Sequence, residues 1–301
     1  MESDTLRKHR ILVLGANGQL GREFAHIGPS YEYCHFHFAA KSQVNIHDTS
    51  SLSSIMEEIK PDYVINCAAY TAVDKAESEA DLCFETNAYA CRSICEAVKT
   101  SGSRLVHFSS DYVYHSYNGF PLQETAPTEP RGVYARSKLE GEKIIRESGV
   151  PALILRTSWV VSSFGHNFVK TMLRLGREKS TLNVVSDQYG TPTYARYLAT
   201  AVMDILLLTE SEADKAELFN DTYNYSPEGI ISWYDLASTI MELAGLDCKV
   251  MPIPTSAYPT PAVRPHWSVM SKKKIRQSFN LETGHWRTGI RQCLEDLRAG
   301  D

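Results

Sequence analysis

The chain has 301 residues, an ordinary globular composition and a formal net charge of −5. Its length permits one large domain or two unequal domains. The negative charge argues against a nucleic-acid-binding protein, and seven cysteines without a CxxC pair indicate neither a disulfide framework nor a zinc site. The N-terminal sequence MESDTLRKHR is too polar for a secretory signal. The most apolar predicted helix, residues 199–208, contains Asp204 and is too short to span a bilayer. We therefore expect a cytoplasmic protein.

A buried strand and a glycine-rich loop begin the predicted fold. Residues 11–14 are continuously apolar, as in a parallel strand covered on both faces. Gly15, Gly18 and Gly21 follow at intervals of three residues. This spacing permits a tight turn, close approach of a pyrophosphate and close packing of the next helix. The segment predicts a dinucleotide-binding loop, although three glycines also suit a plain turn.

A second strand is predicted over residues 33–38, where His35 and His37 alternate with aromatic residues. Two histidines on one strand face without a third ligand do not predict a metal site. The residues after this strand lack the acidic side chain that binds the ribose of NAD and include Lys41, which favours NADPH. An amphipathic helix is predicted over residues 52–59. The alternation of strand and helix is therefore established.

Three further buried strands are predicted over residues 63–66, 105–108 and 152–156. The small residues after the first of these strands would let a cofactor lie against the backbone, or would serve packing alone. A helix is predicted over residues 81–100. Its Asn87 is either a satisfied buried amide or a functional group.

Tyr134 and Lys138 lie four residues apart and therefore share one face of a predicted helix. A free tyrosine has a pKa of about 10, and a nearby cation lowers that pKa; we expect Lys138 to do so. Ser110 ends the preceding strand, at the edge where open α/β sheets bind ligands. About one such tyrosine–lysine pair is expected by chance, so the catalytic interpretation depends on this order of elements.

The alternation of strands and helices loosens after residue 160. Helices are predicted over residues 167–177, 195–208, 232–244 and 287–298, and the proline-rich residues 252–265 predict an ordered surface connection. We expect an α/β fold with a doubly wound parallel sheet and a smaller α-rich substrate lobe. Residues 1–160 would form the NAD(P)-binding Rossmann-type domain, joined by segments around 190–225, and residues 161–301 mainly the substrate lobe.

Several longer motifs narrow this interpretation. Besides GANGQLG and YxxxK, they are NCAAYTAVDKAE at 66–77, SSDYVY at 109–114, RTSW at 156–159, DQYGTPT at 187–193 and PTPAVRPHWS at 259–268. With them, nearly the whole chain resembles the extended short-chain dehydrogenase/reductases, and most narrowly the family that reduces dTDP-4-dehydrorhamnose. The resemblance implies reduction of the C4 ketone of dTDP-4-dehydro-L-rhamnose to dTDP-L-rhamnose, with NADPH or NADH as cofactor.

The resemblance also implies three groups of residues. The expected catalytic residues are Tyr134 as proton donor, Lys138 and Ser110. The expected cofactor contacts are Gly15, Gly18, Gln19, Leu20, Gly21, Asn45, Ile46, Ala68, Ala69, Tyr70, Tyr134 and Lys138. The expected substrate contacts are Ser110, Asp111, Trp159, Thr71, Arg264 and Asn167. For Arg264 and Asn167, a structural role is an equal alternative.

The sequence departs from the family pattern at four positions. Asn45 stands where many relatives have aspartate, Ser110 where many have threonine and Cys67 where alanine is usual. An asparagine can still form hydrogen bonds with the edge of the adenine, and a serine keeps the hydroxyl group of a threonine. We therefore expect these departures to change ligand affinity more than the reaction catalysed. Arg196 is not an oxygen ligand, so the magnesium of some relatives is not expected here, and we predict no metal.

Two other functions remain as alternatives. A nucleotide-sugar dehydratase or epimerase of the same superfamily would use its nicotinamide transiently, but dehydratases have a glutamate where this chain has Tyr112. A non-catalytic nucleotide-binding subunit, like the regulatory partner of methionine adenosyltransferase, would not need Tyr134, Lys138 and Ser110. We expect a nucleotide-sugar ligand, no nucleic-acid or membrane partner, and an assembly compatible with a homodimer.

Overall fold

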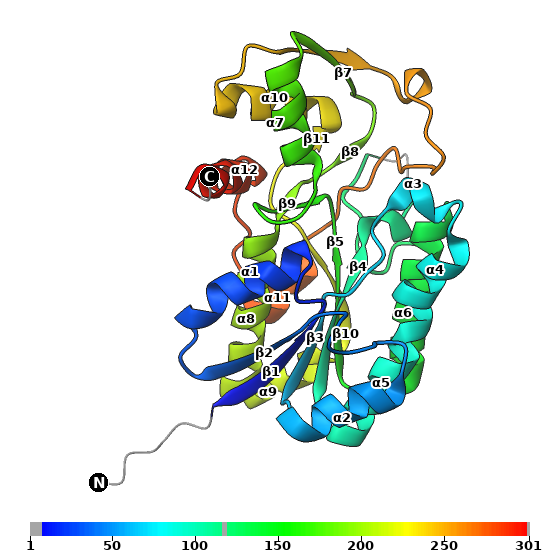
Figure 1. Cartoon of the computed structure of the whole chain (residues 1–301), viewed down its shortest axis with the longest axis vertical. Helices are drawn as coiled ribbons and strands as arrows, with labels where there is room; N and C mark the ends of the chain where they lie inside the picture. The colour runs from blue at the N-terminus through cyan, green and yellow to red at the C-terminus, as the bar shows by residue number, and fades with distance from the viewer. Residues whose placement is uncertain (1–7, 116–118, 300–301) are drawn as a thin grey trace.

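The computed structural model describes residues 8–115 and 119–299. The segment 1–7, for which no secretory signal is predicted, lies outside the described residues. Within the described ranges, no helix is both long enough and apolar enough to cross a membrane. The chain folds into two lobes, with a large parallel sheet in the lower lobe of Figure 1.

The central sheet has six parallel strands in the order β10-β5-β4-β3-β1-β2 (Figure 1). The strands are β1 (His9–Leu14), β2 (Cys34–Ala39), β3 (Tyr63–Asn66), β4 (Arg104–Ser110), β5 (Ala152–Thr157) and β10 (Asp221–Tyr225). Strand order reverses at β1, because β2 lies on one side of it and β3 on the other. Ligands of open α/β sheets bind outside the carboxyl ends of the strands at such a switch point.

Helices cover both faces of this sheet and bury its apolar side chains (Figure 1). One face is covered by α1 (Gln19–Ile27), α8 (Ala195–Ser211) and α11 (Lys273–Phe279). The other face is covered by α2 (Thr49–Ile59), α5 (Ala90–Ser101) and α6 (Val133–Ser148). The predicted Rossmann-type doubly wound sheet is therefore confirmed.

The helix predicted over residues 81–100 is not a single α-helix. It consists of α4 (Ala80–Phe84), a π-helical turn η2 (Glu85–Tyr89) and α5, preceded by the short α3 (Val73–Ala76). Hydrophobic periodicity cannot reveal this change, because one π-turn shifts the register of the helix without ending it. The turn places Asn87 against α6, as described below.

The second lobe has its own apolar core. Its main helices are α7 (Phe168–Glu178), α10 (Trp233–Ala244) and α12 (Trp286–Ala299). Three two-stranded sheets join them: β6 (Val160–Val161) with β9 (Thr193–Tyr194), β7 (Thr181–Val185) with β12 (Lys249–Ile253), and β8 (Tyr189–Gly190) with β11 (Ile231–Ser232). The remaining short elements of the whole chain, most of them in the first lobe, are α9 (Ala213–Ala216), η1 (Gly28–Ser30), η3 (Asp111–Val113), η4 (Glu217–Phe219) and η5 (Thr255–Ala257).

The chain returns to the first lobe after residue 194. Helix α8 packs on the sheet, β10 forms its edge beside β5, and α11 packs nearby. We therefore propose that the Rossmann domain comprises residues 1–160 with the segments 195–225 and 273–279, and that the remainder forms the substrate lobe. The sequence did not predict β10 as a strand.

A buried charge network fixes α6 to the sheet. Glu142 on α6 has no exposed surface and accepts hydrogen bonds from Arg156 Nε (2.9 Å) and Nη2 (2.7 Å) and from Ser109 Oγ (2.5 Å). Arg156 Nη1 also donates to Tyr114 Oη at 2.6 Å. Burial acts to raise the pKa of Glu142, but its pKa lies below the usual range because Arg156 and Ser109 stabilise the carboxylate.

Replacement of Glu142 by Gln should destabilise the protein by about 3–5 kcal/mol, since it leaves Arg156 buried without its charge partner. The free energy of unfolding from urea titration at neutral pH measures this loss. Glu147→Gln on the exposed side of the same helix is the matched control and should change stability little. Equal stabilities of the two variants would contradict the prediction.

Candidate functional site

The glycine loop connects β1 to α1 at the carboxyl edge of the sheet. Gly15 has a φ of +78°, and a Cβ atom there would lie 2.6 Å from the backbone nitrogen of Ala68. A Cβ atom on Gly21 would lie 2.5 Å from the carbonyl oxygen of Gly15. Gly18 is the N-cap of α1 and supplies no side-chain cap, so the first N–H groups of the helix remain open to an anion. The loop therefore has the geometry of a pyrophosphate cradle.

The segment after β3 forms the opposite wall of this cradle. Asn66 at the end of β3 accepts a hydrogen bond from the Ala68 N–H at 3.2 Å. Ala68 is partly buried, whereas Ala69 and Thr71 are exposed. The Tyr70 hydroxyl donates to Glu79 at 2.6 Å, and this hydrogen bond raises the pKa of the Tyr70 phenol to about 12. The predicted cofactor residues thus line one backbone-rich surface beside the glycine loop.

The side-chain amide of Asn87 connects this wall to α6. Its Oδ1 accepts from the Tyr70 N–H at 2.8 Å, and its Nδ2 donates to the Tyr70 carbonyl and to Ser137 Oγ, each at 3.0 Å. Asn87 is buried, and a Cβ atom on Gly141 would lie 2.3 Å from the Asn87 carbonyl oxygen. Asn87 is therefore a satisfied amide, and its role is to position the wall and the helix.

Tyr134 and Ser110 meet where α6 begins and β4 ends. A hydrogen bond with Ser110 favours the phenolate of Tyr134, but burial dominates and raises the pKa of the phenol to about 12. The Tyr112 ring packs edge-on against Tyr134 with centroids 5.9 Å apart. Tyr134 is therefore protonated at neutral pH, as a proton donor must be.

The expectation that Lys138 lowers the pKa of Tyr134 is wrong for this structure. Lys138 is buried, and its charge acts on Cys91, Glu142 and Cys83 rather than on the phenol. Burial lowers the pKa of Lys138 itself. No hydrogen-bond acceptor within the described ranges contacts its ammonium group. Lys138 thus lies in the right helix turn to bind hydroxyl groups of a cofactor, although it does not activate the phenol.

Asp111 presents a buried carboxyl group with one oxygen unused. Its Oδ1 accepts from Ser110 Oγ at 3.2 Å, whereas Oδ2 has no hydrogen-bond partner among the described residues. Burial raises the pKa of Asp111 to about 7, although hydrogen bonds from Ser268 and Ser110 act in the opposite direction. A carboxyl group of this kind changes charge near neutral pH and can bind a hydroxyl group as donor or acceptor.

Trp159 lies just beyond β5 with a φ of +46°, which is rare for a bulky residue. Its indole stacks on Trp233 with centroids 3.6 Å apart, and a Cβ atom on Gly190 would lie 2.6 Å from Trp159 Cε2. Strained backbone of this kind costs about 1–3 kcal/mol and concentrates at ligand sites. The conformation supports the predicted contact between Trp159 and the substrate.

The predicted adenine contacts lie after β2. Asn45 is exposed, and its Oδ1 accepts from the His47 N–H at 3.1 Å, which leaves its amide nitrogen toward solvent. Ile46 is partly buried against the α2 side of the sheet. Lys41, the expected determinant of NADPH preference, is exposed in the same segment.

Asn167 has a structural role in the ligand-free chain. Its Oδ1 caps α7 through the Lys170 N–H, and its Nδ2 donates to the Ser162 carbonyl at 2.6 Å and to Gln19 Oε1 at 2.9 Å. These contacts occupy the amide, so of the two roles considered for Asn167 the structural one is favoured. They also hold the predicted cofactor residue Gln19, while its neighbour Leu20 packs into the sheet core.

Arg264 is likewise engaged by the protein. Its guanidinium forms a two-pronged ion pair with Asp74, with Nη1–Oδ1 at 2.9 Å and Nη2–Oδ2 at 2.7 Å. From the sequence, Asp74 was assigned no role and Tyr112 was used only to argue against a dehydratase, although the two residues lie inside the motifs NCAAYTAVDKAE and SSDYVY. The polar residues within those motifs were the sequence signal that could have identified them.

No metal was expected, because Arg196 offers no oxygen ligand for one. Its guanidinium bridges two acidic groups, Glu23 Oε2 at 3.0 Å and Asp296 Oδ2 at 2.8 Å. Among the residues that the structure describes, no three His, Cys, Asp or Glu side chains gather as metal ligands. His35 and His37 lie side by side on β2, with ring centroids 5.9 Å apart. That the protein binds no metal stays a prediction.

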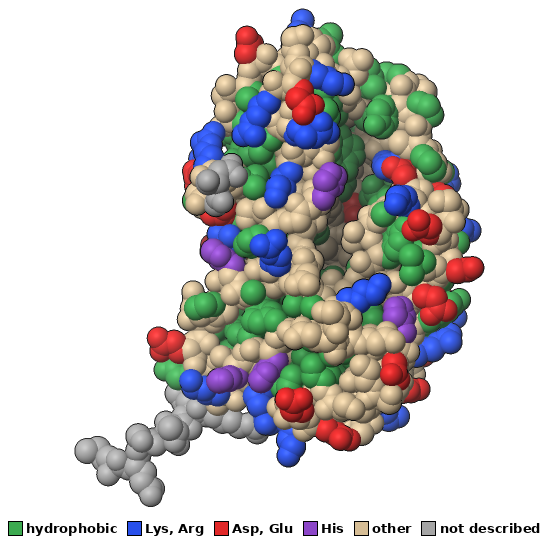
Figure 2. Space-filling model, viewed as in Figure 1, with side chains coloured by type: hydrophobic (Ala, Val, Ile, Leu, Met, Phe, Trp, Pro, Cys, Tyr) green, Lys and Arg blue, Asp and Glu red, His purple; other side chains and the backbone are tan. Residues whose placement is uncertain are grey.

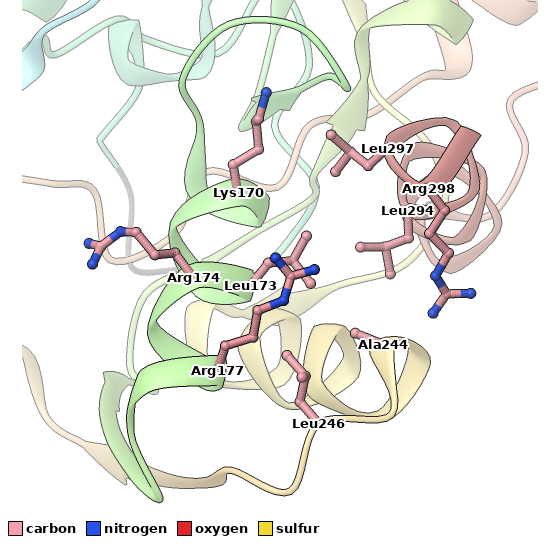
Figure 3. Close-up of a pocket in the computed structure, with 9 residues that line it drawn as sticks. All are labelled: Lys170, Leu173, Arg174, Arg177, Ala244, Leu246, Leu294, Leu297 and Arg298. Carbon is pink, nitrogen blue, oxygen red and sulfur yellow. The ribbon is translucent and has the colours of Figure 1, made fainter. Parts of the chain in front are cut away.

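A cavity of about 190 Å³ lies in the second lobe between α7, α10 and α12 (Figure 3). Leucines form its floor, and the cationic side chains at its rim are Lys170, Arg174, Arg177 and Arg298. None of the predicted catalytic, cofactor or substrate residues lines it. The space-filling view has a separate hollow between the two lobes (Figure 2). Because Tyr134, Ser110 and the glycine loop lie at the sheet edge facing the second lobe, we place the candidate site there.

Comparison with known proteins identifies the family of the chain. The model of the RmlD substrate binding domain matches residues 9–299. The dTDP-4-dehydrorhamnose reductase of Burkholderia thailandensis is 37% identical over 300 residues, which cover 96% of this chain and 99% of that protein. The Escherichia coli enzyme of the same name is 36% identical, with 95% and 97% covered.

A solved structure with bound NADP is also similar. The crystal structure of dTDP-4-dehydrorhamnose reductase from Bacillus anthracis in complex with NADP has a TM-score of 0.87 and 32% identity. The match covers 96% of this chain and 99% of that one. A dTDP-glucose 4,6-dehydratase from Streptomyces venezuelae, at 17% identity and a TM-score of 0.78, shows the shared fold alone.

Gly21→Ala should weaken NADPH binding at least about tenfold, equivalent to 1.4 kcal/mol, because the new methyl group clashes with the backbone of the cradle. Titration of NADPH fluorescence measures the dissociation constant. Gly284→Ala is the matched control, since no atom lies within 4 Å of the added Cβ. Unchanged affinity in Gly21→Ala would refute the assignment of the cradle.

Asp111→Asn should alter the pH dependence of stability. The pKa of Asp111 is about 7 in the folded protein and about 3.9 in an unfolded chain, so ionisation destabilises the native protein as pH rises between these values. The variant lacks this penalty. Its stability relative to the native protein should rise by more than about 1 kcal/mol between pH 4.5 and pH 8 in urea titrations. A constant difference would show that Asp111 does not titrate in this range.

Proposed function

Because the chain belongs to the RmlD substrate binding domain family, we propose that it reduces the C4 ketone of dTDP-4-dehydro-L-rhamnose to dTDP-L-rhamnose with NADPH. The observation that carries this proposal is a protonated Tyr134 beside Ser110, at the sheet edge that also bears the glycine loop. The names of its full-length relatives support the substrate and the cofactor.

The residues of the cradle fit a dinucleotide. The open N-terminus of α1 and the Gly15–Ala68 approach suit a pyrophosphate, and Lys138 has an unengaged ammonium group for ribose hydroxyls. We expect the cationic side chain of Lys41 to favour NADPH. NADH stays the alternative cofactor. When bound, NADPH supplies the hydride for C4.

Residues of the protein itself carry out the proton transfer. As C4 is reduced, its oxygen gains negative charge and takes the hydroxyl proton of Tyr134. Ser110 donates a hydrogen bond to the same oxygen and so stabilises the charge before the proton arrives. The phenol carries its proton at the start of each turnover, because its pKa lies well above neutral pH. Asp111 and Trp159 are positioned to bind the sugar hydroxyls and ring.

The competing functions lack a supporting observation. A dehydratase needs an acidic side chain where Tyr112 packs edge-on against Tyr134. A purely nucleotide-binding subunit does not explain why Ser110 and Tyr134 meet at the sheet edge. The cytoplasmic location and the homodimer stay predictions, and light scattering of the purified protein tests the second.

Tyr134→Phe should keep NADPH binding and lower turnover by about 10²- to 10⁴-fold, the usual contribution of a general acid. Loss of reduced-nicotinamide absorbance with enzymatically generated dTDP-4-dehydro-L-rhamnose measures turnover, and analysis of the product identifies dTDP-L-rhamnose. Tyr33→Phe is the control, because Tyr33 is exposed and precedes β2 at the amino end of the sheet, opposite the edge that carries the site. Native turnover by Tyr134→Phe would refute the assigned proton donor, whereas a product that has lost water would indicate a dehydratase.

A further inference from the structure

Residues 254–268, here called the strap, run from the second lobe past the candidate site. The segment is orange in Figure 1 and passes α3 of the first lobe. Near its beginning, Thr255 donates through N and Oγ1 to Asp187 at 2.8 Å and 2.6 Å. At its end, the Ser268 N–H donates to the Tyr189 carbonyl at 2.9 Å. Both ends are therefore hydrogen-bonded to the second lobe, and Trp267 near the second end also donates through Nε1 to the Phe120 carbonyl of the first lobe at 2.9 Å.

The middle of the strap is held by one residue of the first lobe. Within the described ranges, every hydrogen bond that residues 256–264 make outside the strap goes to Asp74. The donors are the Ala262 N–H at 3.4 Å and the two terminal nitrogens of Arg264. Most side chains of residues 256–263 are exposed. Asp74 thus supplies the hydrogen bonds that hold the middle of the strap to the first lobe.

The ion pair leaves one edge of the Arg264 guanidinium unused. Asp74 occupies the end formed by Nη1 and Nη2, and Nη1 also donates to Thr260 Oγ1 at 2.7 Å. The Nε–H and the second hydrogen of Nη2 point along another edge. Among the described residues, no acceptor contacts this edge. Two parallel N–H donors of this kind match two oxygens of a phosphate group.

This guanidinium lies close to the proton donor. Arg264 is near enough to Tyr112 for its charge to favour the phenolate of Tyr112, and the Tyr112 ring contacts Tyr134. In a nucleotide sugar, the diphosphate is attached at C1 and the reacting ketone is at C4, on opposite sides of one sugar ring. A site that binds the ketone at Tyr134 therefore needs a phosphate-binding group beyond the sugar ring, and the unused edge of Arg264 is the candidate for it.

We propose that Asp74 is a positioning residue, which holds the strap closed and directs the free edge of Arg264 to the diphosphate of the nucleotide-sugar substrate. The proposal rests on the proposed function, because it assigns a subsite of the same substrate. Arg264 would bind the diphosphate directly, in agreement with one of the two roles considered from the sequence. Asp74 would act through Arg264 and would not touch the substrate.

The test compares dTDP with thymidine, because the two differ only in the diphosphate. Isothermal titration calorimetry of the NADP⁺-saturated protein gives the affinities for dTDP and for thymidine. The proteins compared are the native chain and the variants Asp74→Asn, Arg264→Lys and Asp81→Asn. Asp81→Asn is the control, because Asp81 is an exposed acid on the neighbouring helix. Asp74→Asn and Arg264→Lys should weaken dTDP binding about tenfold or more and leave thymidine binding unchanged. The control should match the native protein for both ligands.

Steady-state kinetics and hydrogen exchange separate positioning from general damage. Both variants should raise KM for the 4-keto sugar nucleotide about tenfold while kcat changes less than about threefold, since the interaction is made equally in ground and transition states. Amide exchange of residues 256–264 should accelerate in Asp74→Asn. NADPH affinity should stay native, which shows that the variants are folded.

Two outcomes overturn the inference. Native dTDP affinity in both variants would exclude Arg264 from the diphosphate subsite, whether or not the enzyme turns over. A loss in Arg264→Lys with native dTDP affinity and native strap exchange in Asp74→Asn would exclude the positioning role. Absence of turnover by the native protein would instead refute the proposed function, and the dTDP and thymidine titrations would still decide between a diphosphate site and none.

Discussion

The side-chain amide of Asn87 joins the cofactor wall after β3 to helix α6, which carries Tyr134 and Lys138. The positions of these two residues relative to the cofactor wall depend on this contact. One end of this amide fixes the backbone of Tyr70 in the cofactor wall, and the other holds Ser137 on α6. Gly141 lets α6 approach the Asn87 carbonyl, at a distance that no side chain would allow. Because Tyr134 lies on the same helix one turn from Ser137, its distance from the cofactor wall is set by this contact.

Burial is the largest cause of the pKa shifts at the site. It raises the pKa of Tyr134 to about 12, brings the pKa of Asp111 close to neutrality and lowers the pKa of Lys138. The shifts of Asp111 and Lys138 have a cost in folding stability near neutral pH, because burial disfavours their charged forms. The ion pair of Glu142 with Arg156 beneath α6 anchors the helix on which two of these residues lie. A firmly fixed helix thus supports a site that is itself destabilising.

The sequence predicted those features that depend on local spacing. The glycine loop, the strand ends and the position of Ser110 follow from short patterns, and the structure places them at one sheet edge. Strand β10 could not be predicted, because its sequence DTYNY lacks an apolar run, and its buried Asn224 is satisfied by the distant residues Tyr114 and Leu122. The electrostatic environment of Lys138 depends partly on residues distant in the sequence, since Cys91 and Cys83 on other helices act on it.

The contacts between the lobes differ in strength around the cleft. On one side, Arg196 bridges the fully buried Glu23 of α1 and Asp296 of α12. Arg196 and Glu23 both belong to the first lobe, so the pair that crosses between the lobes is Arg196 with Asp296, whose side chains are 16% and 20% exposed. On the other side, Asp74 is 41% exposed in its pair with Arg264, and partly exposed pairs contribute about 0–1 kcal/mol. Separation of the lobes at the strap therefore breaks the more exposed of the two pairs, together with the hydrogen bond from Trp267 to Phe120. On the opposite side of the cleft, Arg196 keeps α12 next to α1, the helix that follows the glycine loop.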